Sequence, residues 1–141
     1  MWKLFTLGAA LAVVSVAHAD DARTLQVVYF NPAGRDPAPE YRQRLDRVMT
    51  EIQAFYADGM LDRGYGPMTF GLERDEDGQL VIHLVQGEHE AEYYTGQKGH
   101  ELRREVGDAL ADEGTDADAE TLIIFQNLLR TDGSKLSGSC P

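Results

Sequence analysis

The residues best suited to metal chemistry lie between positions 87 and 101. His89 is flanked by acids in the segment Gly-Glu-His-Glu-Ala-Glu, residues 87–92, and His100 is followed directly by Glu101. Imidazole and carboxylate groups are both zinc ligands. The weak metal candidates of this sequence are therefore His89, Glu90 and His100.

The spacing around these histidines does not match a zinc-peptidase motif. In H-E-x-x-H, two histidines one helical turn apart present two ligands on one face of a helix. Arg104 occupies the second histidine position after His100, and Tyr93 occupies it after His89. Each segment thus offers one ligand of that motif instead of two. We expect structural or solvated roles for these histidines, and we assign no catalytic residue and no cofactor to this chain.

The first residues have the pattern of a secretory signal peptide. Lys3 precedes an apolar run at residues 4–16, and Ala17 and Ala19 form a small-x-small cleavage site before Asp20. The apolar run has the length of a signal-peptide core and is too short to span a bilayer. The sequence therefore predicts a signal peptide at residues 1–19 and export to the periplasm or the cell exterior.

The charge of the chain limits its partners. The 141 residues include 24 acids and 13 Lys and Arg, which gives a net charge of −11 and a pI near 4.6. Nucleic acids and anionic membranes attract clustered basic residues, so we expect neither as a partner once the signal peptide is removed. Residues 20–130 are predicted to form a single α/β domain or an N-terminal subdomain. Residues 131–141 are predicted to be an unstructured tail that ends abruptly, and the redox state of its single Cys140 is left open.

The elements that must position these side chains alternate between strand and helix. Apolar and β-branched runs predict strands over 24–30, 68–74, 79–85 and 121–126, and the Asp-Gly pair at 77–78 predicts a hairpin between the middle two. Helices are predicted over 40–61 and 99–111. The first carries a stripe of large apolar residues at Tyr41, Leu45, Val48, Met49, Ile52, Phe55, Tyr56 and Met60.

This order indicates an α+β or α/β fold, in which helices pack on a mixed sheet. The strands at 24–30 and 121–126 are almost entirely apolar, which favours the centre of the sheet for both. The same order of strand, helix, strand, strand, helix, strand also fits a ferredoxin-like sandwich, which is the alternative fold.

A set of short motifs lies along the stretch from residue 27 to residue 94. Its residues are Val28-Tyr-Phe30, Pro32, Tyr41-Arg-x-Arg44-Leu-Asp-Arg47, Ile52-Gln-x-Phe-Tyr56, Met60, Gly64-Tyr-Gly-Pro67, Thr69-Phe70, Gly78 and residues 81–87. With these residues the stretch resembles the N-terminal half of bacterial secreted metallopeptidase-like proteins of the metzincin type. The Phe-Tyr pair and the Gly-x-Gly-Pro segment are the more specific parts of this resemblance, which covers about half of the chain.

In such proteins a strand like residues 122–125 is followed by a helix bearing H-E-x-x-H-x-x-G-x-x-H, whose histidines bind zinc and whose Glu acts as general base. No position of this sequence matches that helix. The resemblance therefore implies an N-terminal fragment of an exported metallopeptidase that is inactive alone. Its zinc and its peptide or protein substrate would depend on a downstream half. The alternative is a complete exported α+β binding module with an unknown ligand, and the oligomeric state is open in both cases.

Overall fold

The computed structural model describes residues 24–95, 98–118 and 120–128. The strands are β1 (Thr24–Asn31), β2 (Gly71–Leu72), β3 (Ile82–Gln86) and β4 (Thr121–Gln126). The helices are α1 (Tyr41–Asp62), the short 3-10 helix η1 (Ala91–Tyr94) and α2 (Gly99–Asp112). Both predicted helices and the two apolar strands are present, with ends within a residue of those expected. The predicted signal peptide and the predicted tail lie outside the described residues.

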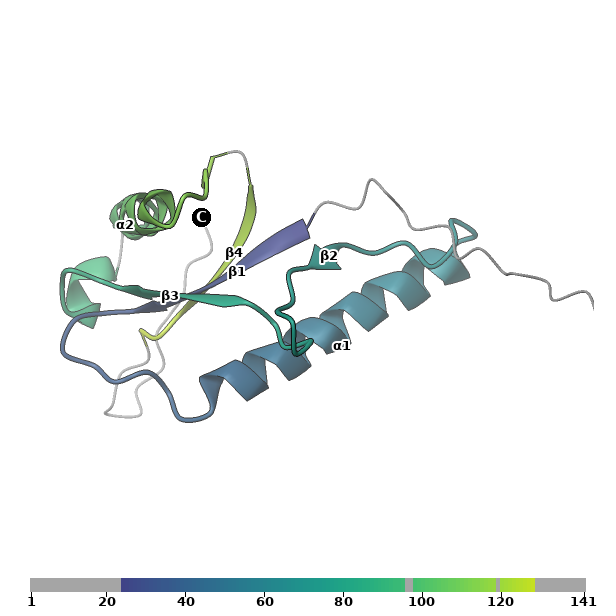
Figure 1. Ribbon diagram of the computed structural model, residues 1–141, viewed down its shortest axis with the longest axis horizontal. Coiled ribbons are helices and arrows are strands. Elements are labelled where there is room, and N and C mark those ends of the chain that lie inside the picture. Colours follow the sequence, from purple (N-terminus) through teal and green to yellow (C-terminus); the bar gives the residue numbers. More distant parts are fainter. Residues whose placement is uncertain (1–23, 96–97, 119, 129–141) are drawn as a thin grey trace, which may run out of the picture.

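The sheet is built around β1, which is parallel to each of the other strands. It pairs with β4 from Leu25 to Phe30, with β3 from Val27 to Asn31, and with β2 through Thr24 and Leu25. Because β3 and β4 pair with the same stretch of β1, they lie on its opposite edges. Leu25 pairs with both β2 and β4, so β2 lies on the same edge of β1 as β3, and β1 is the central strand (Figure 1).

The α+β architecture with helices packed on a sheet is confirmed, but the described strands form a parallel sheet instead of the expected mixed one, and the ferredoxin-like alternative is wrong. A ferredoxin-like sandwich has an antiparallel sheet, whereas every strand pair in this sheet is parallel. The difference lies in the connection from β2 to β3, because helices between β1 and β2 and between β3 and β4 occur in both folds. In a ferredoxin-like sandwich a hairpin makes these two strands antiparallel, whereas here β2 and β3 both run parallel to β1.

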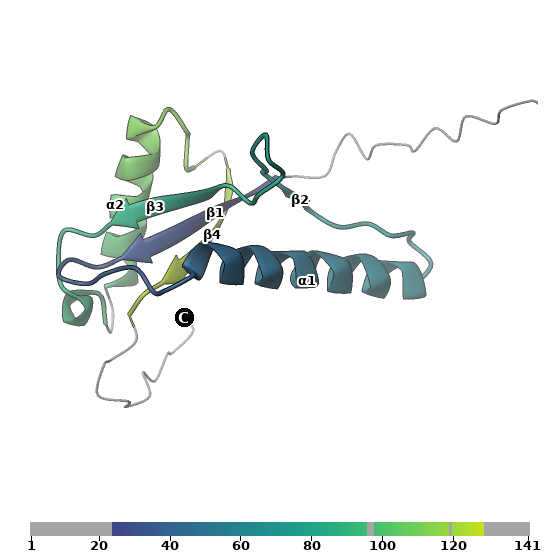
Figure 2. The same cartoon turned by 60° about the horizontal axis from the view of Figure 1, so that its bottom comes forward.

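Two cores lie on opposite faces of the sheet, because successive side chains of a strand point to opposite faces. Val28 and Phe30 of β1 face α2, where the other buried members are Val85, Tyr94, Leu102, Val106 and Leu110. Val27 and Tyr29 face α1, together with Met49, Leu80 and Ile82. α1 and α2 thus cover different faces (Figure 2), and β1 is buried on both, as its sequence predicts.

The apolar stripe of α1 is buried only in part. Met49 is fully buried, and Leu45 and Ile52 pack against the core, whereas Phe55 and Tyr56 are 75% and 54% exposed. The C-terminal half of α1 extends beyond the end of the sheet, and the chain runs back beside it to β2 (Figure 2). A helix of 22 residues is longer than the short strands on which it packs.

The predicted hairpin is present as a tight turn with shorter strands than expected. Gly78 has a φ of 77°, and Arg74 forms an isolated antiparallel bridge with Leu80. The Asp75 carboxylate accepts hydrogen bonds from the backbone N–H groups of Asp77 and Gln79 and so closes the turn. Because β2 and β3 each pair with β1 in parallel, little of their length pairs with each other.

Candidate functional site

Three amide side chains meet where the parallel strands end. Asn31 ends β1 and is fully buried, Gln86 ends β3, and Asn127 follows β4. The Asn31 amide donates to Gln86 Oε1 over 3.1 Å, and Asn127 donates to Asn31 Oδ1 over 2.8 Å. Ligands of parallel sheets commonly bind at this edge. Here the amides bond one another and nearby carbonyls, so they hold the strand ends in register.

Gly87 directs the chain from β3 toward α2. A Cβ atom at this position would lie 2.5 Å from Cζ of Phe30 and 2.9 Å from the Tyr94 hydroxyl oxygen. Only glycine avoids this overlap, because it has no Cβ atom. The loop after β3 therefore packs closely over the core, and the backbone N–H of Ala33 fixes it by donating to the His89 carbonyl over 2.8 Å.

Glu105 on α2 is a buried acid beneath this loop, and it is only 5% exposed. Its Oε2 atom accepts a hydrogen bond from the Tyr94 hydroxyl over 2.7 Å and another from the Glu88 N–H over 3.0 Å. The Tyr94 hydroxyl in turn accepts one from the His89 N–H over 3.0 Å. Burial, and then the hydrogen bond to Glu105, raise the pKa of Tyr94 to about 12. Tyr94 thus stays protonated and orients the carboxylate.

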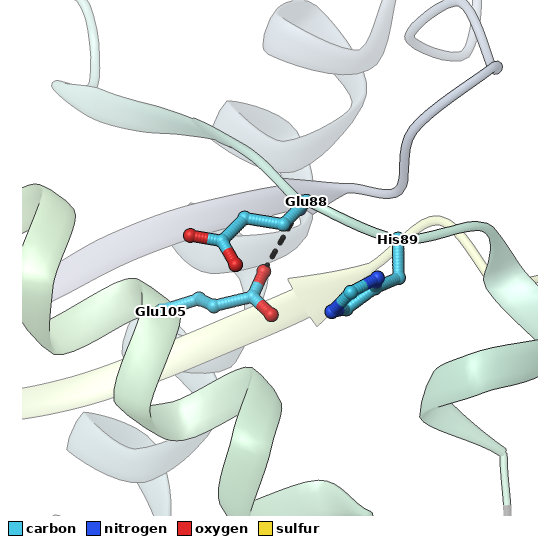
Figure 3. A group of neighbouring side chains, drawn as sticks. All are labelled: Glu88, His89 and Glu105. Atoms are coloured by element: carbon cyan, nitrogen blue, oxygen red, sulfur yellow. Dashed lines mark hydrogen bonds between the residues drawn. The ribbon is translucent and has the colours of Figure 1, made fainter.

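The second oxygen of Glu105 lacks a hydrogen bond. Oε1 is buried, and no donor among the described residues lies within hydrogen-bonding distance of it. The Arg104 guanidinium comes within 4.0 Å. The side chains of Glu88 and His89 are exposed and lie beside this carboxylate, and one ligand atom from each of the three residues lies within 4.8 Å of the others (Figure 3). The arrangement can therefore present two carboxylates and one imidazole to a cation.

The His89 ring is further positioned by an aromatic contact. Its centroid lies 3.9 Å from that of Tyr93, with a tilt of 37° between the rings, and the ammonium group of Lys98 lies 3.8 Å from the Tyr93 centroid. These contacts place the imidazole at the start of η1. They also place a positive charge near the acidic loop.

The sequence candidates are only partly brought together. His89 belongs to the cluster with Glu88 and Glu105, whereas Glu90 is an exposed residue preceding η1. His100 lies in the first turn of α2, 73% exposed, with its Nε2 3.3 Å from Glu101 Oε1. Sequence reasoning missed Glu105. The available signal was its position three residues after Leu102 and next to Val106, on the apolar face of α2.

Comparison with known proteins gives a structural likeness. No family model and no curated protein matches the chain. Among solved structures, catalytically inactive OgpA from Akkermansia muciniphila, in complex with an O-glycopeptide substrate, has a TM-score of 0.64 and 26% identity. A wild-type OgpA structure gives 0.63 and 27%. Each match covers 74% of this chain, which spans only 30% of the OgpA chain.

These matches establish an α+β fold similar to part of OgpA. They support a metallopeptidase-like fold for this chain, which agrees with the resemblance found in the sequence. Within the described ranges, no helix is both long and apolar enough to cross a membrane.

Proposed function

We propose that this chain forms the N-terminal part of an exported metallopeptidase-like protein and does not cleave peptides alone. The observation that carries the proposal is the fold shared with OgpA over 74% of the chain. The sequence contains no H-E-x-x-H, so in this proposal the catalytic zinc is bound by residues outside it. The signal-peptide pattern at residues 1–19 supports export.

The outer edge of β4 supports an additional polypeptide in the functional protein. Residues 122–125 are Leu, Ile, Ile and Phe, a pattern expected in the centre of a sheet. In the structure these residues are half-buried, and among the described strands β4 pairs only with β1. An apolar strand with one free edge is a template for further pairing. We propose that another part of the same metallopeptidase-like protein covers it.

The exposed apolar residues of α1 support the same arrangement. Phe55, Tyr56 and Leu61 are each more than half exposed, as are Tyr65 and Met68 in the segment that follows. Contiguous exposed apolar surface marks an interaction site in a soluble protein. OgpA extends well beyond the part that this chain matches. Its additional length is the kind of polypeptide that would cover such a surface.

A peptide is the proposed substrate class of the whole protein. OgpA in its inactive form was crystallised with an O-glycopeptide. We propose that the protein containing this chain likewise acts on peptides, with glycosylated peptides as the first class to examine. This chain would contribute the rigid sheet against which the zinc-bearing part is positioned.

The test combines the reading frame with an activity assay. The genomic sequence after Pro141 should contain in-frame H-E-x-x-H, and the protein extended through it should cleave an O-glycosylated peptide. The chain ending at Pro141 should cleave neither that peptide nor its unglycosylated counterpart. A downstream sequence without the motif, or cleavage by the short chain, would contradict the proposal. If the downstream sequence lacks the motif, cooperative unfolding of the short chain would favour the alternative of a complete exported binding module.

A further inference from the structure

We propose that Glu88, His89 and Glu105 form a binding site for a divalent transition-metal ion of the zinc class. The three residues present two carboxylates and one imidazole, with one ligand atom from each lying within 4.8 Å of the others (Figure 3). This site lies on the loop after β3 and on α2. It is separate from the catalytic zinc of the proposed function, whose ligands would lie outside this sequence.

The strongest indication is the buried carboxylate of Glu105. Its side chain is 4% exposed, and moving a carboxylate out of water is costly unless its oxygens find compensating partners. One N–H donor, from Glu88, and one O–H donor, from Tyr94, satisfy Oε2, whereas Oε1 accepts no hydrogen bond from the described residues. A cation bound to Oε1 would supply the missing partner.

Arg104 does not take this role. Its nearest contact with Oε1 is 4.0 Å, which is longer than a hydrogen bond. Its guanidinium instead donates to Asp108 over 2.9 Å and to Glu101 over 3.3 Å. Arg104 therefore interacts with this site only electrostatically, through Glu105 and Glu88, and leaves Oε1 without a hydrogen bond.

Glu88 and His89 can complete a coordination shell with small movements. Both side chains are exposed, whereas their backbone N–H groups are fixed by Glu105 and by the Tyr94 hydroxyl. The backbone thus holds the two residues beside the carboxylate, and the His89 ring is further positioned by its contact with Tyr93. Tyr94 orients Glu105, as hydrogen-bond donors commonly orient metal ligands from the outer shell.

The ligand set favours zinc over calcium. Calcium takes six to eight oxygen ligands, whereas zinc binds imidazole nitrogen together with carboxylate oxygen and is four-coordinate. Three protein ligands leave one position for water. Because Glu88 and Glu105 are 17 residues apart on separate elements, bound metal would fasten the loop after β3 to α2. We therefore expect the metal to stabilise the fold.

The test is a zinc titration of the purified exported chain in the presence of excess Mg²⁺ and Ca²⁺. We expect one zinc per chain by equilibrium dialysis and a higher Tm in its presence. His89→Ala should weaken binding by more than about tenfold, the loss that even outer-shell changes cause at metal sites. The matched control is His100→Ala, which removes an exposed histidine outside the cluster and should bind zinc as wild type does.

Glu88→Gln is the second variant, because it removes an exposed ligand without touching the core, and it should also weaken binding. A wild-type chain that binds no zinc would overturn the proposal. It would also be overturned by zinc binding that both His89→Ala and Glu88→Gln leave unchanged, or that His100→Ala weakens as much as His89→Ala does. None of these results bears on the proposed function, which depends on the downstream motif and on peptide cleavage.

Discussion

The Tyr94 hydroxyl donates a hydrogen bond to Oε2 of Glu105 over 2.7 Å, and this contact joins η1 to α2 inside the core. The same hydroxyl accepts a hydrogen bond from the His89 N–H, so one side chain links the loop after β3, η1 and α2. Glu105, which accepts the hydrogen bond from Tyr94, is a buried acid. The stability of this region therefore depends on a polar group within an otherwise apolar cluster.

Tyr94→Phe should destabilise the chain by roughly 1–3 kcal/mol, because it leaves a buried carboxylate with fewer donors. Urea unfolding followed by circular dichroism measures this change. Tyr93→Phe is the matched control, because the Tyr93 hydroxyl makes no hydrogen bond with any described residue, and it should change stability by much less. Equal losses in the two variants would show that the bond to Glu105 is unimportant.

The raised pKa of Tyr94 predicts a loss of stability in alkaline solution. The pKa is about 12 in the folded chain, against an ordinary value of 10.0. The unfolded chain therefore loses this proton first as the pH rises. The contribution of Tyr94 is fully present below pH 10 and disappears as the pH approaches 12. The stability difference between wild type and Tyr94→Phe should shrink across this window, and a constant difference would contradict the prediction.

Gly87→Ala should destabilise the fold by about 1–3 kcal/mol, the usual cost of overpacking a core. The new methyl group would lie 2.5 Å from Cζ of the Phe30 ring, which is fully buried. Gly59→Ala in α1 is the control, because a Cβ atom there meets no atom within 4 Å. That change should stabilise the helix by up to about 1 kcal/mol. Thermal unfolding of both variants provides the comparison.

Glu40→Gly should stabilise the chain by about 1 kcal/mol. Glu40 precedes α1 with a φ of 55°, the only positive φ of a non-glycine residue within the described ranges, and a side chain in this region is strained. Glycine removes the strain and is well tolerated at a helix N-cap. Glu51→Gly, in the middle of the same helix, should instead cost about 1 kcal/mol. Denaturant midpoints of the two variants should therefore shift in opposite directions.

The secondary structure was largely predictable because it follows from local patterns. The run from Thr24 to Phe30 is buried on both faces as its composition indicates, and the spacing of Leu102, Val106 and Leu110 locates the buried face of α2. The predicted strand at 68–74 is reduced to Gly71–Leu72. Its length depends on how much of β1 remains for pairing, and that is a tertiary property.

The candidate site was less predictable because its parts are distant in sequence. Glu105 follows two arginines and looks solvated in sequence, whereas Tyr94 and the Glu88 backbone make it a buried acceptor. The amides Asn31, Gln86 and Asn127 have no motif spacing. Only the parallel arrangement of their strands brings them together.

The central position of β1 has a consequence for how the chain folds. β1 is the first of the described strands to be synthesised, whereas Asn127, which bonds to Asn31 across the strand ends, follows 96 residues later. Closing so long a loop is entropically costly, and parallel sheets built from distant segments form slowly. Until β4 is synthesised, one edge of β1, which is almost wholly apolar, has no strand with which to pair. Before β4 is synthesised, the chain therefore requires protection from aggregation.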